Sequence, residues 1–389
     1  MENRALDPIG AAEKILYEIT EKTEELKTLN LMILGKTGVG KSTLINALFG
    51  EKRVQTGIGR PVTTDITRIA AEHLTIYDTP GLELSGENSM TNLLTQVVDV
   101  INKQIEEGTI EDAVHCILYC VSTPSHRFED NEAEFIRSLQ AKIKTHNIPI
   151  FIVLTQAFNR QDSAELKDYI ASLNLKIKAI VPVLALSYYV DEDYTAKPRG
   201  VPELANLIAE AIPESVRDTF VAIQCANLEL KKRKAQAIVG TAAASAAITG
   251  AVPIPFSDAV LLVPEQIGMM AGITAAFGVP VDKAALTAVL SATIGTGGAT
   301  LLGRTIVTNL IKLIPGAGSV IGGAISAATA AALTAALGEA YIVIMIMVAK
   351  GEVSPEFIKT QEGMKEIARI FAEKMKIKRN DDGTPKISG

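Results

Sequence analysis

Residues 35–42 read Gly-Lys-Thr-Gly-Val-Gly-Lys-Ser, and this spacing of glycines, a lysine and a hydroxyl suits the binding of phosphate groups. Glycines let the backbone turn tightly and aim successive N–H groups at phosphate oxygens. We expect Lys41 to neutralise the β and γ phosphates of a nucleoside triphosphate and to act in catalysis, and Ser42 to offer its hydroxyl to Mg²⁺. The motif predicts these nucleotide-binding residues: Gly35, Thr37, Gly38, Val39, Gly40, Lys41, Ser42 and Thr43.

A second motif, Asp78-Thr79-Pro80-Gly81, follows the apolar run 74–77 and begins 36 residues after Ser42. An aspartate at the end of a strand can hold Mg²⁺, usually through a water molecule, and a glycine N–H in the next loop can point at the γ-phosphate. Such a loop responds to the presence of that phosphate. We therefore expect Asp78 to be a metal ligand and Gly81 to be a catalytic residue.

The segment between these motifs, residues 60–65, reads Arg-Pro-Val-Thr-Thr-Asp. A loop that senses the γ-phosphate needs a threonine that ligates Mg²⁺ and contacts that phosphate. Thr64 is the first choice for this catalytic and metal-binding role, and Thr63 is the alternative. A solvated loop with two incidental threonines is the competing interpretation.

The elements that must position these motifs follow from the hydrophobic periodicity. Short apolar runs occupy residues 29–34, 67–71, 74–77, 114–121, 149–154 and 180–186, and polar helix-like stretches such as 130–144 and 163–172 follow most of them. Continuous apolar runs that alternate with helices predict an α/β fold, in which a mostly parallel sheet is flanked by helices on both faces. The phosphate-binding motif then lies between a strand and a helix whose N-terminus adds partial positive charge.

Charge is distributed unevenly and divides the chain into zones, because residues 235–349 carry only seven acidic or basic side chains. An apolar stripe at helical spacing predicts an amphipathic helix in residues 1–28, and a second one in residues 351–378. Between them we expect an α/β nucleotide-binding domain in residues 29–215 and an all-α apolar domain in residues 216–350. Residues 379–389 have the composition of a disordered tail.

The apolar domain admits two interpretations. Its uncharged stretches reach the length of a bilayer span, and the basic run 231–234 suits an anionic leaflet on the cytoplasmic side. However, Ala, Gly, Thr and Ser dominate these stretches, and Glu339 would be costly at the middle of a membrane. A soluble bundle with an alanine-rich core therefore competes with a membrane module, and the scarcity of charge favours the membrane.

With these elements in place, the first 215 residues or so resemble the G domains of the translation-factor-related GTPase class, above all its Era-like group. Pro61-Val62-Thr63-Thr64 looks like the switch of that group. The phosphate loop together with Asp78-Thr79-Pro80-Gly81-Leu82 is also similar to septins and immunity-associated GTPases. The resemblance implies GTP and GDP as ligands, Mg²⁺ dependence and slow hydrolysis. Residues 252–258 and Gln266 resemble part of an apolar helical domain of unknown function that is fused to bacterial G domains.

The family reads guanine with the motif Asn/Thr-Lys-x-Asp after its fifth strand, where this chain has Thr155-Gln156-Ala157-Phe158. Thr155 fits the motif, Gln156 can lay its aliphatic stem on a base, and Ser187 belongs to a segment that resembles the base loop of the family. We expect these three residues to bind the nucleotide. Phe158 cannot accept hydrogen bonds from guanine, and Asp162 stands at the wrong spacing, so the preference for guanine follows from the resemblance alone.

Hydrolysis is expected to be slow for two reasons. Leu82 stands where Ras-like proteins carry a water-orienting glutamine, and Gly38 stands where potassium-stimulated Era-like members carry an asparagine. A partner, or a second copy across the nucleotide face, would complete the site. The leading interpretation is a GTPase switch whose helical half engages a membrane or a protein partner. The alternatives are an oligomerising GTPase of the membrane-remodelling or defence type and a nucleotide-binding scaffold with negligible hydrolysis.

Composition bounds the partners and the compartment. The net charge of −6 gives no reason to expect nucleic acid as a partner. Cys116 and Cys120 fall in one apolar run, which predicts buried thiols in a reducing cytosol. The polar start Met-Glu-Asn-Arg lacks the pattern of a secretory signal, so we expect a cytoplasmic protein with possible membrane contact through residues 235–349.

Overall fold

The structure, a computed structural model, describes residues 8–50, 66–79, 87–107, 113–143, 147–189, 191–193, 195–249, 264–294, 327–366 and 369. The chain divides into two compact units. Residues 26–227 form an α/β unit, and residues 1–25 together with 228–389 form a helical unit.

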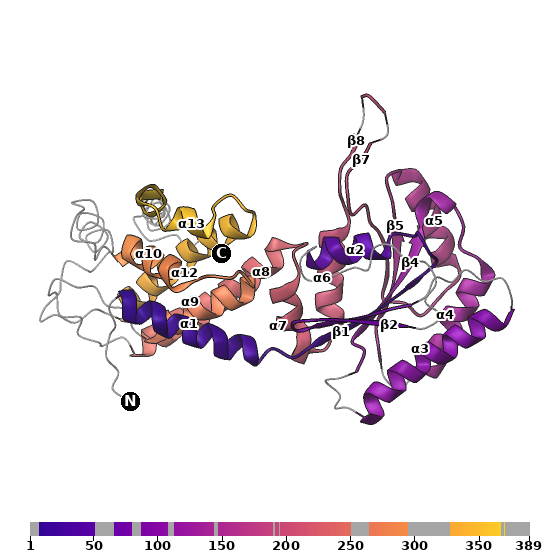
Figure 1. Ribbon diagram of the computed structural model, residues 1–389, viewed down its shortest axis with the longest axis horizontal. Helices are drawn as coiled ribbons and strands as arrows, with labels where there is room; N and C mark the ends of the chain where they lie inside the picture. The colour runs from indigo at the N-terminus through magenta and orange to yellow at the C-terminus, as the bar shows by residue number, and fades with distance from the viewer. Residues whose placement is uncertain are drawn as a thin grey trace, which may run out of the picture. The chain divides into compact units, whose positions relative to one another are not determined.

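The α/β unit is built on a six-stranded sheet with the strand order β2-β3-β1-β4-β5-β6 (Figure 1). The strands are β1 (Leu29–Gly35), β2 (Thr67–Ala71), β3 (Leu74–Asp78), β4 (Cys116–Ser122), β5 (Ile150–Thr155) and β6 (Ala179–Pro182). Strand β2 pairs antiparallel with β3, and the other neighbours are parallel. The predicted mostly parallel α/β sheet is confirmed. Because β1 and β5 are buried on both faces, they read as continuous apolar runs in the sequence.

Helices cover both faces of this sheet (Figure 1). The apolar sides of α3 (Glu87–Glu107), α4 (Asp130–Lys142) and α5 (Arg160–Ser172) join one core cluster with alternate residues of the strands. The other face carries α2 (Lys41–Phe49), α6 (Val201–Ala211) and α7 (Glu214–Ile223). On that face the rings of Phe49 and Phe220 meet edge to face at 6.2 Å. A separate two-stranded hairpin, β7 (Tyr188–Tyr189) and β8 (Thr195–Ala196), projects from the unit.

The unit boundaries differ from those predicted at residues 28/29 and 215/216, because α7 belongs to the α/β unit. Thr219 donates a hydrogen bond to the Lys27 carbonyl (2.8 Å), and the Cys225 N–H donates to the Leu48 carbonyl (2.7 Å). These contacts extend the unit to residue 227. They join residues far apart in the sequence, so the boundary expected from the extent of the family resemblance fell short of α7.

The predicted N-terminal helix is present as α1 (Pro8–Glu24), and it packs within the helical unit. Its residues Ala11, Ala12 and Ile15 are fully buried in the core of that unit. The other helices there are α8 (Leu228–Thr249), α9 (Pro264–Phe277), α10 (Lys283–Ile294), α12 (Ala327–Ala349) and α13 (Pro355–Ile358). Periodicity identified the apolar face of α1 but not the unit against which it packs.

The predicted C-terminal helix is interrupted. Helix α13 ends at Ile358, and a second helical stretch covers residues 361–366. The break lies at Thr360, whose hydroxyl donates to the Phe357 carbonyl (2.7 Å) and accepts from the Gly363 N–H (3.0 Å). Threonine in this role caps a new helix start and therefore ends the preceding helix. The predicted tail, 379–389, lies outside the described residues.

Lys231, the first residue of the basic run, is buried and donates to the Phe277 carbonyl (2.7 Å) at the C-terminus of α9. A cation at this end of a helix is stabilised by the helix dipole. The lysine faces into the helical unit, so neither a solvated helix end nor an anionic leaflet describes its role in this structure.

Among the described residues, one stretch of α12, Ala330–Ala349, is long and apolar enough to cross a membrane, and 47% of it is buried within the unit. Its polar groups have partners there. Tyr341 shares a 2.7 Å hydrogen bond with Thr274, and Gln236 donates to Glu339 at 3.4 Å. A core helix of a soluble bundle and a membrane-spanning helix both meet this criterion of length and composition.

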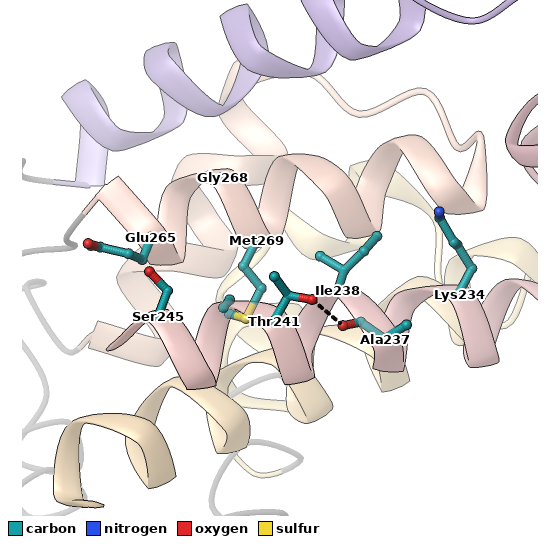
Figure 2. Close-up of a pocket in the computed structure, with 9 residues that line it drawn as sticks. Lys234, Ala237, Ile238, Thr241, Ser245, Glu265, Gly268 and Met269 are labelled. Carbon is teal, nitrogen blue, oxygen red and sulfur yellow. Dashed lines mark hydrogen bonds between the residues drawn. The ribbon is translucent and has the colours of Figure 1, made fainter. Parts of the chain in front are cut away.

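In the helical unit, α8 and α9 line a cavity of about 400 Å³. Figure 2 shows the residues that line it. Small and apolar side chains such as Ala237, Ile238 and Met269 form most of its wall, and Lys234 and Glu265 stand at opposite ends. The two charged groups do not converge on one point, so the cavity lacks the clustered cations that a phosphate site requires.

Candidate phosphate and magnesium site

The phosphate loop lies between the end of β1 and the start of α2, as predicted. Gly35, Gly38 and Gly40 have φ angles of 138°, 76° and 94°, a region of backbone conformation that residues other than glycine rarely adopt. A Cβ at Gly35 would lie 2.5 Å from the Cys120 carbonyl oxygen. The loop therefore depends on its glycines, which place the backbone against the N-terminus of α2, where unpaired N–H groups and the helix dipole favour an anion.

Lys41 folds back across this loop. Its ammonium donates to the carbonyls of Gly35 (2.9 Å) and Lys36 (3.3 Å), which holds a positive charge over the loop. Ser42 is exposed in the first turn of α2, next to Lys41. The structure thus places the predicted phosphate counter-charge and the predicted hydroxyl ligand side by side.

A carboxylate network that the sequence analysis missed fastens the loop to α4. The Lys36 ammonium lies 3.1 Å from Glu129 and 3.2 Å from Glu132. Glu132 is 2% exposed and also accepts from the Tyr119 hydroxyl (3.0 Å). Burial lowers the pKa of Lys36, but its hydrogen bonds and charge interactions with both glutamates outweigh this and raise the pKa overall. The signal in the sequence was Glu129-x-x-Glu132, a capping box that begins α4.

Asp78 ends β3, opposite Ile33 of β1, at the carboxyl edge of the sheet. Its Oδ1 atom is buried and has no hydrogen-bond partner among the described residues. Burial raises the pKa of Asp78, and the Lys41 ammonium lowers it only in part, which also shows that the two charges interact. An orphaned carboxylate oxygen and an exposed serine hydroxyl are both oxygen ligands of the kind that Mg²⁺ prefers. The other predicted residues of this centre, Thr64 with its alternative Thr63, Gly81 and Leu82, lie outside the described residues.

The raised pKa of Asp78 predicts that Asp78→Asn stabilises the nucleotide-free protein at pH 7. An unfolded aspartate titrates near pH 3.9, at about the ordinary value, whereas the folded one ionises at higher pH. Below the pKa of the unfolded state the carboxyl is protonated in both states and does not affect the free energy of unfolding. As the pH rises, ionisation of Asp78 lowers the free energy of unfolding, and the full loss is reached above the pKa of the folded state. The variant should therefore melt at a higher temperature than the parent at pH 7 but not at about pH 3.5.

Two further measurements complete this test. GTP binding by Asp78→Asn should lose its dependence on Mg²⁺, because a neutral amide is a weak ligand for that ion. The matched control is Asp168→Asn on α5, since Asp168 is exposed and should leave both the melting temperature and the Mg²⁺ dependence unchanged. Equal melting temperatures of parent and Asp78→Asn at pH 7 would contradict the expectation that the ionised Asp78 carboxylate destabilises the folded protein.

The predicted base-binding segment meets the phosphate loop. The Thr155 hydroxyl donates to the carbonyls of Val39 and Val121, the latter at 3.0 Å. Gln156 donates to the Gly38 carbonyl (3.1 Å) and accepts from Ser122 (3.2 Å). The structure thus brings Thr155 and Gln156 to the loop.

Ser187 is exposed and immediately precedes β7. The residue after it, Tyr188, stacks on Phe158, a contact that the sequence analysis did not predict. Asp162, considered above as a substitute for the missing aspartate, lies 3.6 Å from the imidazole of His126. The structure therefore ties the two segments of the expected base site together through aromatic rings rather than through a carboxylate.

Comparison with known proteins agrees with this geometry. Residues 30–156 match the family model described as 50S ribosome-binding GTPase. Septin-1 of Drosophila melanogaster is 27% identical over 215 residues, which cover 48% of this chain and 55% of that septin. Neuronal-specific septin-3 of Mus musculus is 25% identical over 231 residues, which cover 52% of this chain and 63% of that septin. The chain thus spans between about half and two thirds of the length of these curated relatives.

Two solved structures are similar to part of this chain at low sequence identity. A probable GTP-binding protein engB shares 19% identity at a TM-score of 0.33, over 47% of this chain and 97% of its own. Toc33 from Arabidopsis thaliana in complex with GDP and Mg²⁺ shares 21% identity at a TM-score of 0.32, over 54% of this chain and 92% of its own.

Proposed function

Because the chain contains a P-loop GTPase domain, to which residues 30–156 correspond, we propose that it is a Mg²⁺-dependent GTPase switch with slow intrinsic hydrolysis. The observation that carries the proposal is the placement of Lys41 and Asp78, which are close enough for the Lys41 charge to lower the pKa of Asp78 although the two groups form no ion pair. The Lys41 ammonium is held over the phosphate loop, and the half-buried Asp78 has a buried Oδ1 atom without a hydrogen-bond partner among the described residues. A triphosphate and a divalent cation would satisfy both groups at once.

The residues of the loop have separate roles in this proposal. Backbone N–H groups of residues 38–43 would hold the phosphates, and Lys41 would offset charge that develops on the β and γ phosphates. Ser42 and Asp78 would hold Mg²⁺, with Thr64 added from the preceding loop. The ion, when bound, would neutralise negative charge on the phosphate oxygens. Gly81 would contact the γ-phosphate, and the apolar Leu82 beside it cannot orient a water molecule, which keeps hydrolysis slow.

The helical unit supplies the second half of the proposal. We propose that it engages a membrane or a protein partner in the GTP-bound state, and that the protein is cytoplasmic and recruited to the membrane through residues 235–349. The apolar α12 supports this reading, since about half of its spanning-length stretch is not buried within the unit. Sedimentation with anionic vesicles should be stronger with a non-hydrolysable GTP analogue than with GDP. Absence of any co-sedimentation would leave the helical unit as a soluble, partner-binding bundle.

Calorimetric titration with GTP, GDP and ATP, each with and without Mg²⁺, tests the nucleotide half of the proposal. We expect GTP and GDP to bind, and GTP to require Mg²⁺ for full affinity. Single-turnover hydrolysis then separates a slow GTPase from the alternative of a scaffold with negligible hydrolysis, which Leu82 and Phe158 favour. A strong rise in rate with protein concentration would instead support the oligomerising alternative. Failure of GTP to bind at all would refute the proposed function.

A further inference from the structure

Two aromatic rings from distant parts of the sequence lie face to face, one from the segment after β5 and one from the start of β7. The rings of Phe158, which follows β5, and Tyr188, which begins β7, are stacked with centroids 4.4 Å apart and an interplanar angle of 11°. Tyr188 is 47% exposed although it belongs to this stack. The pair therefore presents an aromatic surface to solvent.

The position of Phe158 is set by the segment after β5, which is hydrogen-bonded to the phosphate loop. Thr155 and Gln156 bond to the carbonyls of Val39 and Gly38, which belong to the phosphate loop. Phe158 stands two residues further along. In parallel α/β sheets, ligands bind outside the carboxyl ends of the strands, and β1, β5 and β6 are parallel members of this sheet. A nucleotide whose phosphates lie in the phosphate loop can thus place its base at the segment that follows β5, residues 155–158.

The hydrogen-bonding groups of this loop are already engaged. Both ends of the Gln156 amide have partners, and the Ala157 N–H donates to the Val183 carbonyl (3.1 Å). Arg199 donates to the carbonyls of Ala157 and Phe158. What the loop offers to a base is therefore the Phe158 ring with Tyr188 stacked on it, rather than an acceptor for the base edge.

We propose that the Phe158–Tyr188 pair binds the base of the nucleotide by its face, so that the site accepts purine nucleotides generally instead of selecting guanine by its edge. The inference rests on the proposed function, because it requires a nucleotide in the phosphate loop. A site that pairs with polar groups of a base rejects analogues that lack them by roughly 10⁴-fold. Stacking tolerates any base with a sufficient π-face, and a purine offers more of it than a pyrimidine.

The first test uses the unmodified protein and needs no substitution. Affinities for GTP, ITP, XTP, ATP and CTP are measured by calorimetry in the presence of Mg²⁺. We expect the four purine nucleotides to bind within roughly tenfold of one another and CTP to bind more weakly. A preference for GTP over ITP or ATP of a thousandfold or more would overturn the inference, since ITP lacks only the 2-amino group of guanine.

The second test removes the rings. The double variant Phe158→Leu/Tyr188→Leu is expected to lose roughly tenfold in affinity for every purine nucleotide, with little change for CTP. Tyr188→Phe keeps the ring and should bind as the parent does. The matched control is Tyr169→Leu, which removes an exposed tyrosine of α5 and should change no affinity. Equal GTP affinities of the double variant and this control would overturn the inference.

A third test adds a carboxylate at position 158 to introduce selectivity for guanine. Phe158→Asp should favour GTP over both ATP and XTP, because a carboxylate can accept from N1–H and the 2-amino group of guanine. Equal affinity of that variant for GTP and XTP would show that position 158 does not face the base. If the parent binds no triphosphate, the proposed function itself fails. If the parent binds GTP tightly and the aromatic variants bind it equally well, only the present inference fails.

Discussion

Lys41→Ala is expected to lower the affinity for GTP by roughly a hundredfold or more, the usual consequence of removing one partner from a desolvated charge pair. The Lys41 ammonium already lies over the phosphate loop, within 2.9 Å of the Gly35 carbonyl, so it needs no rearrangement to meet a phosphate. Alanine would leave the β and γ phosphates without their counter-charge. It would also leave the half-buried Asp78 carboxylate without the cation that partly offsets its desolvation.

Calorimetry with GTP and Mg²⁺ measures this effect, and two variants sharpen it. Ser42→Ala should remove mainly the part of the affinity that depends on Mg²⁺, because Ser42 offers a hydroxyl to the metal and no charge to the phosphates. Lys142→Ala, at an exposed lysine in the last turn of α4, is the control for loss of one positive charge and should bind as the parent does. If Lys41→Ala also binds GTP with parental affinity, the phosphate-loop assignment is wrong.

The sequence was sufficient to predict the parts of the fold and site that depend on local spacing. The strand–loop–helix context of residues 35–42 required only an apolar run before the glycines and a helical pattern after them, and both are present as β1 and α2. Asp78 fell at a strand end because the run 74–77 stops there. Thr155 and Gln156 were predicted from the family resemblance, which places a base-reading motif directly after the fifth strand, and the structure places both against the phosphate loop.

Contacts between distant segments could not be predicted from these patterns. The bond between Lys36 and Glu132 spans 96 residues, and the stack of Phe158 on Tyr188 joins a β5 loop to a hairpin that is not part of the main sheet. A single sequence gives residue types and their periodicity but does not show which distant residues contact one another. The same limit applies to α1, whose apolar face was evident although its place in the helical unit was not.

The helical unit contains a close helix contact that is equally invisible in the sequence. Gly338 of α12 faces α8 and α9 so closely that a Cβ there would lie 2.4 Å from Cγ2 of Val239 and 2.9 Å from Sδ of Met269. Val239 is buried and β-branched, so its methyl group has little freedom to move away. Packing therefore requires glycine at position 338, even though glycine is an unfavourable residue in the interior of a helix such as α12.

Gly338→Leu is accordingly expected to destabilise the helical unit by about 3 kcal/mol, at the upper end of typical overpacking costs. Gly338→Ala should also be destabilising, because its steric cost of about 1–3 kcal/mol is at least as large as the gain of about 1 kcal/mol in helix propensity. Urea unfolding followed by circular dichroism measures the effect. GTP affinity should not change, since the phosphate loop belongs to the other unit.

Gly240→Ala is the matched control, because it makes the same exchange in the neighbouring helix α8. A Cβ at Gly240 would meet nothing within 4 Å, so only the gain in helix propensity of about 1 kcal/mol remains and the variant should be more stable than the parent. The two glycine-to-alanine exchanges are thus expected to have opposite signs. If both stabilise the protein by similar amounts, α12 does not pack against α8 at Gly338, and the apolar helix would be available to a membrane instead.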